Sequence, residues 1–279
     1  MNYKTIKNIS VYAILTIFAI VMVFPFFWMI VNSFNTEQNI FRIPPSFIPD
    51  KLFKPGMFDN YQVVLSQYHF LRYTFNSLFV SFSAAFGQIL TCSLAGFAFA
   101  RMNFKGKNVL FGLLLATMMV PLQVTIIPEF LLMMKLGWLD SYLPLIVPSF
   151  LVGSFGTFLL REFYENIPKD LEDAAVIDGA GPFKLYWYVF LPLGKTPIAT
   201  LFIIAFMNNW NALLRPILYI SSDNLMTLPM ALTQFQSQYG ARWNLLLTGS
   251  FLAVIPLFII YLFMQKYMVE GITHTGLKG

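Results

Sequence analysis

Acidic side chains are concentrated in one stretch of the chain, residues 161–195, which holds nearly half of the 13 Asp and Glu residues. Within it, Glu172 and Asp173 are adjacent, and Asp178 follows shortly. Carboxylates grouped in this way can accept charge-assisted hydrogen bonds from basic groups on another protein. We therefore expect this stretch to be a recognition surface, which the rest of the chain must position.

Residue types that catalysis or metal binding requires are sparse. The 2 histidines, His69 and His274, and the 1 cysteine, Cys92, are far apart in the sequence and form no cluster with metal-ligand spacing. No nucleophile has an evident base. The tripeptide GKT at residues 194–196 looks like the end of a phosphate-binding loop, but Val189 replaces the Gly that the loop needs five residues earlier. The sequence predicts no catalytic residue and no metal or nucleotide site.

The composition is that of a membrane protein. Hydrophobic residues make up 57% of the chain and charged residues 11%, and the mean hydropathy is +0.66. A soluble domain carries about 25% charged residues, because its surface must face water. This composition excludes a soluble enzyme, a nucleic-acid-binding module and a disordered chain. The net charge of +5 is better explained by basic cytoplasmic loops than by nucleic acid.

Long apolar runs indicate the fold. A transmembrane helix needs roughly 20 apolar residues, and six runs of this kind are present. The runs are continuous, whereas a β-barrel would show short alternating segments. We predict an all-α polytopic membrane protein with one transmembrane domain over residues 1–279, whose spans lie at about 9–31, 73–100, 108–127, 141–160, 196–214 and 243–265.

The distribution of basic residues predicts the orientation. With the N-terminus inside, the inner segments carry more of the 18 Lys and Arg residues than the outer segments, as the positive-inside rule requires. Both termini are then cytoplasmic. The acidic stretch 161–195 becomes an inner loop, and the Pro-rich stretch 35–72 becomes an outer loop, a plausible dock for an external partner.

A short helix is expected inside the inner loop. Asn166 is a suitable N-cap, Pro168 fits the first turn, and Gly179 is a natural stop. Its small-residue face would let another protein's backbone approach closely. That face comprises Leu171, Ala174 and Ala175.

A second helix is expected after Pro182. Four aromatic residues share one of its faces at helical spacing, as in a helix that lies at the membrane interface. They are Phe183, Tyr186, Trp187 and Phe190.

The inner loop resembles the EAA loop of ABC-importer permeases. That pattern is Glu-Ala-Ala, three residues, Gly, nine residues, Ile, one residue and Leu-Pro. Here Asp173-Ala174-Ala175, Gly179 and Leu191-Pro192 match it. Asp173 replaces Glu and keeps the charge, and Val189 replaces Ile and keeps the branched shape.

The resemblance extends along nearly the whole chain and is to the carbohydrate branch, of the maltose-transporter type. The other matching strings are Asn76-Ser77-Leu78, Arg101 with Lys105-Gly106-Lys107, Pro121 with Gln123 and Pro128, Trp210-Asn211, Thr227-Leu228-Pro229, and the tail segments Glu270-Gly271 and Leu277-Lys278-Gly279.

The resemblance implies a permease subunit that moves a sugar, polyol or related solute into a bacterial cell by alternating access. The implied location is the cytoplasmic (inner) membrane, among membrane lipid. The implied partners are a second permease in a heterodimer, two cytoplasmic ATPase subunits and an extracytoplasmic solute-binding protein. ATP and Mg would be bound by the ATPase, so that this chain needs no cofactor and is not an enzyme.

The resemblance also assigns roles to residues. The ATPase-coupling set comprises Leu171, Glu172, Asp173, Ala174, Ala175, Asp178 and Gly179, with Glu172 and Asp173 anchoring the helix. Polar residues inside a span are costly and suggest function, so a solute-path set comprises Asn208, Asn209, Trp210 and Asn211. Hydrogen bonding between helices is an equal alternative for Asn208.

Three further polar residues lie in or near the spans. We expect Gln88 and Gln123 mainly to join helices, and Glu129 to lie at the membrane interface and not in a proton relay. No Arg cluster suited to phosphate is visible in the spans.

Two other functional classes remain open. A secondary transporter or channel would need charged residues near the middle of its spans, and such residues are nearly absent from this sequence. A membrane protein with a structural or assembly role is the second class. Within the ABC interpretation, a glycerol phosphate or phosphodiester is the alternative cargo.

Overall fold

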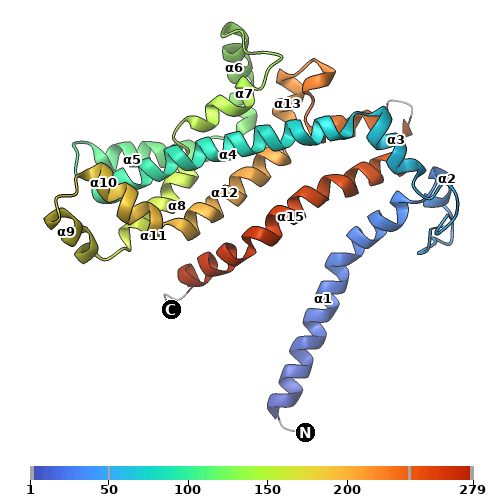
Figure 1. Ribbon diagram of the computed structural model, residues 1–279, viewed down its shortest axis with the longest axis horizontal. Coiled ribbons are helices and arrows are strands. Elements are labelled where there is room, and N and C mark those ends of the chain that lie inside the picture. Colours follow the sequence, from blue (N-terminus) through green and yellow to red (C-terminus); the bar gives the residue numbers. More distant parts are fainter. Residues whose placement is uncertain (1–2, 50, 238–239, 277–279) are drawn as a thin grey trace. The chain divides into compact units, whose positions relative to one another are not determined.

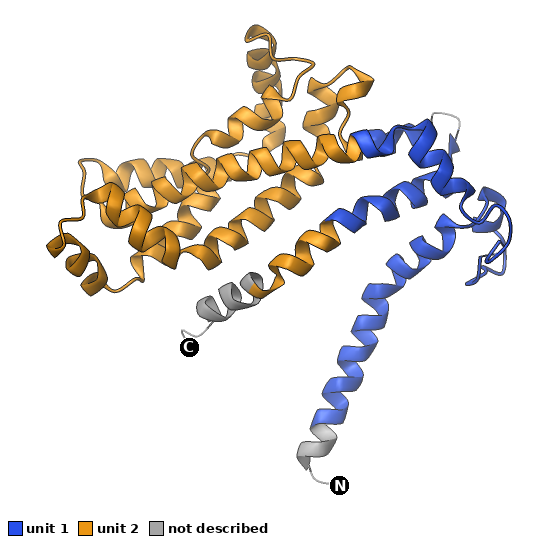
Figure 2. Cartoon of the chain, viewed as in Figure 1, with its two compact units in different colours: residues 1–72, 231–256 blue, residues 73–230, 257–279 orange. Residues whose placement is uncertain are grey.

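The computed structural model describes the backbone of residues 3–49, 51–237 and 240–276, and the side chains of 8–49, 51–236 and 240–266. Nearly all of its regular structure is helical (Figure 1). The chain forms two compact units, unit 1 with residues 1–72 and 231–256, and unit 2 with residues 73–230 and 257–279 (Figure 2). The side chains of the tail segments that carry the family resemblance, from Glu270 onward, lie outside the described residues.

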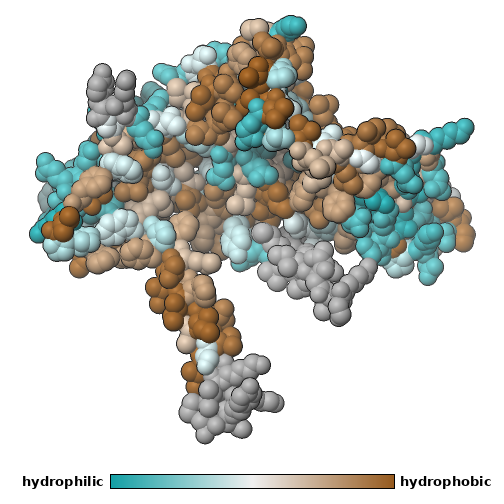
Figure 3. All heavy atoms as spheres, turned by 180° about the vertical axis from the view of Figure 1, so that it is seen from behind, coloured by the Kyte–Doolittle hydropathy of each residue, from teal (hydrophilic) through white to brown (hydrophobic). Residues whose placement is uncertain are grey.

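Unit 1 contains a long apolar helix. Helix α1 (Tyr3–Ser33) has large hydrophobic side chains on all sides, and most of them are exposed from Ile9 to Ile30. Figure 3 shows apolar atoms along its described part. A helix that is hydrophobic all round belongs in lipid or against another apolar surface. Its segment Asn8–Ser33 is long enough to cross a membrane.

The C-terminal end of α1 is held by polar side chains of unit 1. Asn60 Nδ2 donates hydrogen bonds of 2.8 Å to the carbonyl oxygens of Ser33 and Asn35. Asn244 Nδ2 donates to Asn60 Oδ1 at 2.8 Å, and Thr248 Oγ1 donates to Ser33 O at 3.0 Å. These bonds satisfy carbonyl groups at the end of α1. The remaining elements of the unit are α2 (Glu37–Ile40), α3 (Asp59–Gln67), the short antiparallel strands β1 (Gln236–Ser237) and β2 (Gly240–Ala241), and the first part of α15 (Trp243–Gly276).

Unit 2 is a helical bundle that contains the inner loop. Helix α4 (Phe70–Arg101) runs along it, and α8 (Ser154–Glu165) and α12 (Lys195–Trp210) pack together beside it (Figure 1). The other helices are α5 (Lys107–Ala116), α6 (Leu122–Lys135), α7 (Leu143–Ile146), α9 (Lys169–Ile177), α10 (Pro182–Leu185), α11 (Leu191–Leu193), α13 (Leu214–Tyr219) and α14 (Leu228–Leu232).

Two candidate spans of the structure are bent pairs of helices. Among the described residues, 4 helices are individually long and apolar enough to cross a membrane, or up to 6 if each bent pair counts as one span. The run predicted at 108–127 is not continuous, because α5 and the 3₁₀ turn Thr117–Met119 meet α6 at 100°. Pro121 explains the break, since proline disfavours a helical conformation in the residue before it, and Val120 is extended. The second pair, residues 182–193 with α12, is bent by 77°.

Small residues allow α4 and α8 to approach closely. A Cβ atom at Gly96 would lie 2.9 Å from Leu160 Cβ and 3.1 Å from the backbone nitrogen of Arg161. A Cβ atom at Gly156, in α8, would likewise lie 2.8 Å from Cys92 Sγ, in α4. Membrane helices gain stability from such contacts because lipid supplies no hydrophobic force between them.

Candidate functional site

The inner loop forms the predicted short helix, α9. Asp170 and Glu172 lie in its first turn, where they favour the positive end of the helix dipole. Gly179 has φ +80°, a conformation that glycine adopts without a steric penalty. The N–H groups of Gly179 and Ala180 donate to the carbonyls of Val176 and Ala175, both at 2.9 Å. This is the hydrogen-bond pattern of a Schellman motif, and it fixes the end of α9.

The start of α9 differs from the prediction. The cap position is occupied by Pro168, and Asn166 lies two residues earlier, where its Nδ2 donates at 2.6 Å to the carbonyl of Glu162 in the preceding helix α8. The residue before α9 is Pro168, which is extended and makes no side-chain cap. Helix α9 therefore begins at Lys169, after Pro168, and the Asn166 amide satisfies a carbonyl at the end of α8.

The coupling-set residues fall on two sides of α9. Ala175 packs against the hydrophobic cluster of unit 2 that includes Leu160 and Phe190. Leu171, Asp173 and Ala174 are exposed, as are Asp178 and Gly179. Exposed Leu171 and the neighbouring Ile177, which is 85% exposed, give this surface an apolar part beside its carboxylates.

Glu172 is bound within the chain. Its Oε2 accepts a hydrogen bond of 3.2 Å from Arg101 Nη1, and the two side chains are 23% and 6% exposed. Asp173, the next residue, is exposed. Of the two carboxylates expected to anchor α9 to a partner, Asp173 is the one that remains open to an external group.

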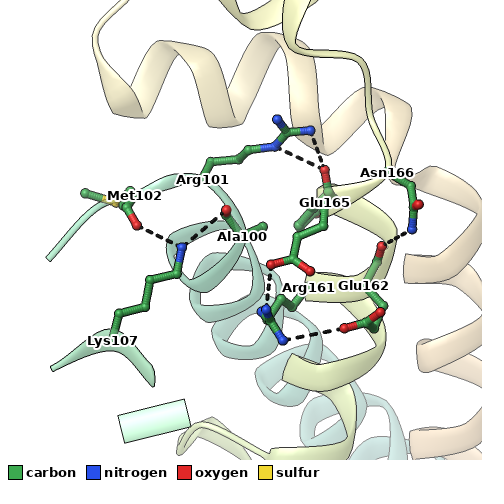
Figure 4. Close-up of polar contacts among 9 residues, drawn as sticks. Ala100, Arg101, Met102, Lys107, Arg161, Glu162, Glu165 and Asn166 are labelled. Atoms are coloured by element: carbon green, nitrogen blue, oxygen red, sulfur yellow. Dashed lines mark hydrogen bonds and ion pairs between the residues drawn. The ribbon is translucent and has the colours of Figure 1, made fainter. Parts of the chain in front are cut away.

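Arg101 joins three segments of unit 2. Its Nε and Nη2 donate to the carbonyl of Tyr164 at 3.1 and 2.7 Å, and Nη2 also donates to Ile167 O. The guanidinium group lies over the Phe190 ring at 5.1 Å. Figure 4 shows the side chain reaching from the end of α4 to the end of α8. Because a buried charge is costly without its partners, this network fixes α9 relative to α4 and α8.

The sequence did not single out the role of Arg101, which was noted only as part of a family string. The available signal was an arginine at the end of a long charge-free run, where it must leave the membrane or find carbonyl partners. Its ion-pair partner lies 71 residues away, so that the sequence could not identify it.

Three hydroxyl groups tie the segment after α9 to the bundle. Tyr186 Oη donates to Ser93 Oγ at 2.9 Å, and Ser93 Oγ and Tyr164 Oη share a hydrogen bond of 2.8 Å. All three residues are buried. The segment thus packs into unit 2 directly behind α9.

The aromatic residues of this segment do not share one face, contrary to the prediction. Tyr186 and Phe190 are buried, whereas Phe183 and Trp187 are exposed. The segment also contains a π-helical turn, Tyr186–Phe190, whose wider hydrogen-bonded ring departs from α-helical spacing.

The predicted solute-path residues separate in the structure. Asn208 and Asn209, at the end of α12, line a cavity of about 390 Å³ in unit 2. Asn209 also donates to the carbonyl of Ala205 at 2.8 Å. Trp210 is 2% exposed and stacks on Phe206, so its indole belongs to the core. Asn211 is exposed, and its Nδ2 donates to Met207 O at 2.9 Å.

Two further polar residues noted in the sequence have clear positions. Gln88 lines the same cavity. Glu129 accepts a hydrogen bond of 2.9 Å from Arg215 Nη2, and its side chain is 15% exposed. Its partner lies 86 residues further along the chain.

Two of the family strings meet in unit 2. Asn76 Nδ2 donates to the carbonyls of Asn224 and Met226 at 3.0 and 2.8 Å. The backbone N–H of Leu228 donates to Ser77 Oγ at 2.6 Å. Asn76-Ser77 and Thr227-Leu228 therefore form one connection between α4 and the loop before α14, beside the cavity. Over the described part of the chain, no group of three His, Cys, Asp or Glu residues could hold a metal ion.

Comparison with known proteins yields one family. Residues 88–274 match the model described as binding-protein-dependent transport system inner membrane component. An arabinooligosaccharides transport system permease protein of Bacillus subtilis is 34% identical over 97% of both chains. An sn-glycerol-3-phosphate transport system permease protein of Brucella abortus is 31% identical over 99% of both, and a lactose transport system permease protein of Rhizobium radiobacter is 28% identical over 96% of both.

The fold is also found in a solved structure. A chain of a bacterial ABC transporter involved in the import of the acidic polysaccharide alginate matches with a TM-score of 0.81 and 22% identity, over 96% of this chain and 98% of that chain. At this identity the match concerns the fold.

Proposed function

The chain belongs to the family of binding-protein-dependent transport system inner membrane components, and from this premise we propose how it couples ATP hydrolysis to transport and what it carries. It is a permease subunit of an ABC importer in the inner membrane, not an enzyme. It works with an ATPase and a solute-binding protein. Its all-α fold of long apolar helices fits this role.

We propose a sugar or sugar oligomer as the solute. Two of the relatives are named for arabinooligosaccharides and lactose, and one for sn-glycerol 3-phosphate. The cavity beside Asn208 and Asn209 supports a sugar, because its walls carry amide and hydroxyl groups that can replace the hydrogen bonds of water.

We propose the full assembly as a heterodimer with a second permease, two cytoplasmic ATPase subunits that bind ATP and Mg, and an external binding protein. The exposed apolar surface of α1, from Ile9 to Ile30, needs cover by lipid or a neighbouring helix. Both termini lie in the cytoplasm in this proposal, which places α9 on the ATPase side and the Pro-rich stretch 35–72 on the side of the binding protein.

The observation that carries the coupling proposal is the attachment of α9. Its outer side presents Leu171, Asp173 and Ala174 to a partner, while Glu172 is held by Arg101 at the end of α4. A movement imposed on α9 by the ATPase is thereby passed to α4 and α8, because a buried ion pair and three carbonyl hydrogen bonds resist separation. The bundle then alternates between inward-open and outward-open states.

The coupling proposal is tested by substituting two glycines that follow the end of α9. Gly179 has φ +80° and Gly181 does not, and an added Cβ meets no atom within 4 Å at either site. Gly179→Ala therefore strains the end of α9, whereas Gly181→Ala is the matched control. In vesicles that contain the complete complex, we expect Gly179→Ala and the bulkier Ala174→Trp to reduce solute uptake per ATP hydrolysed. Normal uptake by both variants contradicts the role of α9.

The same vesicles identify the solute. Lactose, an arabinooligosaccharide and sn-glycerol 3-phosphate are each supplied with the binding protein and ATP. Accumulation of a neutral sugar supports the proposal, and accumulation of sn-glycerol 3-phosphate alone supports the alternative cargo. Accumulation without the ATPase subunit contradicts both.

A further inference from the structure

The cavity of unit 2 has a defined chemical character. Helix α4 contributes Ser77, Ser81 and Gln88 from one face, and α12 contributes Asn208 and Asn209. Its volume of about 390 Å³ lies within the range of small-molecule sites, about 300–1,000 Å³. Further lining residues are Ser149, Arg215 and Thr227, with Val80, Leu122, Leu145 and four residues of the segment 212–216.

Buried polar atoms in this wall lack partners among the described residues. They are Ser81 Oγ, Thr227 Oγ1 and Arg215 Nε. The Ser81 residue is completely buried and Thr227 nearly so. A buried hydroxyl or N–H group normally finds a hydrogen-bond partner. The unpaired groups leave hydrogen-bonding capacity beside the cavity, and the accessible part of its wall carries the amide groups of Asn208 and Asn209. This wall suits a ligand that supplies hydrogen-bond donors and acceptors.

The positive charge of the cavity wall, on Arg215, is paired with a carboxylate that does not line the cavity. Arg215 is the one ionisable residue among those that line the cavity. Its Nη2 donates to Glu129 Oε2 at 2.9 Å, and Glu129 lies behind the wall with 15% of its side chain exposed. An arginine already paired with a carboxylate offers little net attraction to an anion, because the two charges largely cancel at the distance of a ligand.

We propose that this cavity binds a neutral polyhydroxylated solute, and that Glu129 determines this specificity by cancelling the charge of Arg215. The proposal rests on the function proposed above and narrows it to uncharged sugars, against a phosphorylated solute. Hydroxyl groups of the solute take the place of water at the amides of Asn208 and Asn209. Without Glu129, the same wall would carry one uncompensated positive charge.

The test measures the electrostatics of the cavity directly, in the complete complex. The native thiol is removed by Cys92→Ala, and a new thiol is placed at an accessible position of the cavity wall by Ser149→Cys or, in a second variant, Leu213→Cys. Each thiol reacts with two methanethiosulfonate reagents, one with a sulfonate and one with a trimethylammonium group. The ratio of their rates is divided by the ratio for a free thiol in solution. Both labelling rates can be measured without transport of a solute.

We expect a normalised ratio close to that of a neutral site. Glu129→Gln should favour the anionic reagent by about threefold or more, since it leaves one charge unpaired at the wall. Glu165→Gln is the matched control, because Glu165 pairs at 2.6 Å with Arg161, which does not line this cavity. Lactose or an arabinooligosaccharide should slow the labelling, and sn-glycerol 3-phosphate should do so only in the Glu129→Gln variant.

Several results overturn the proposal. A rate ratio that Glu129→Gln does not change shows that Glu129 does not set the charge. If sn-glycerol 3-phosphate slows the labelling while Glu129 is present, the neutral-sugar assignment is refuted. It is also refuted if none of the solutes slows the labelling. Absence of labelling at both thiols, in a complex that still contains its ATPase, shows that the cavity is closed to solutes. Loss of the ATPase from the unsubstituted complex would instead refute the function proposed above.

Discussion

At the scale of single residues, Arg101 connects α9 to the neighbouring segments of unit 2. One guanidinium group satisfies two backbone carbonyls, pairs with Glu172 and lies over Phe190. Arginine suits this position because its planar group presents several donors in fixed directions. A lysine has one compact ammonium group and cannot serve the same partners at once.

We predict that Arg101→Ala lowers the free energy of unfolding by about 3 kcal/mol or more, because it leaves buried carbonyls and a carboxylate unpaired. Denaturant unfolding of the purified chain measures the change. Arg101→Lys should recover part of the stability but little of the coupling, read as solute uptake per ATP. Lys105→Ala, at an exposed position in the next turn, is the control. Equal coupling in Arg101→Lys and the unsubstituted protein would contradict the role given to the guanidinium fork.

Asp140 is a second residue with a specific role, outside the spans. Its carboxylate accepts hydrogen bonds from the Ser222 hydroxyl and from the N–H groups of Ser222 and Ser221. These bonds, the Ser222 hydroxyl first among them, lower the pKa of Asp140 below its ordinary value. They favour the ionised form and connect the loop before α7 to the segment before α14.

We predict a pH dependence for this connection. A lowered pKa in the folded state means that the stabilisation is fully present above the ordinary Asp pKa, near 3.9, and is lost as the pH falls through the lower, folded-state value. The difference in melting temperature between the unsubstituted protein and Asp140→Asn should therefore stay constant from neutral pH to about pH 5 and shrink in more acidic solution. Asp223→Asn controls for the removal of a charge nearby. A difference that disappears above pH 5 would contradict the assignment.

At the scale of elements, close contact between α4 and α8 makes the bundle that supports α9. Their approach depends on Gly96, where an added Cβ would lie 3.1 Å from the backbone nitrogen of Arg161. Backbone atoms cannot move aside as a side chain end can, so the helices themselves would have to separate.

We predict that Gly96→Ala destabilises unit 2 by about 1–3 kcal/mol, as overpacking generally does. Gly112→Ala in α5 is the matched control, since no atom lies within 4 Å of its added Cβ. There the higher helix propensity of alanine should be neutral or stabilise by up to about 1 kcal/mol. The test compares the melting temperatures of the two variants in detergent. Equal changes would show that the close approach of α4 and α8 does not contribute to stability.

At the scale of the whole molecule, the orientation in the membrane assigns each surface to a partner. The sign of the Lys and Arg distribution predicts that the loop between α4 and α5 lies inside and the loop after α1 outside. With this orientation α9 faces the ATPase. The opposite orientation would place its carboxylates outside the cell, where no ATPase could reach them.

Cysteine labelling of intact cells tests this orientation. In a Cys92→Ala background, we expect Lys54→Cys to react with a membrane-impermeant maleimide from outside. Lys105→Cys should react only after the membrane is permeabilised. Each variant is the control for the other, because both positions are exposed. Labelling in the reverse pattern would refute the cytoplasmic location of α9.

The sequence alone was sufficient for features that arise from short-range physics. Long apolar runs produce helices in lipid because each helix satisfies its own backbone groups. Helix α9 was predicted from Pro168, the acidic first turn and Gly179, signals that act within one or two turns. The break at Pro121 belongs to the same class, since the restriction that proline imposes on Val120 is local. The continuous apolar run gave no sign of this bend, because hydropathy measures how apolar a segment is and not the direction of its helix axis.

Tertiary structure alone decided which distant residues meet. The pairs Arg101–Glu172, Ser93–Tyr186 and Arg215–Glu129 are separated by 71, 93 and 86 residues. No local propensity connects them, since their contact depends on how α4, α8 and α12 pack around their small residues. The same packing buried Trp210 and left Asn208 and Asn209 at the cavity, a difference that the sequence of this segment did not reveal. Burial is a property of the assembled helices, and a residue's type determines only what it can do once its neighbours are in place.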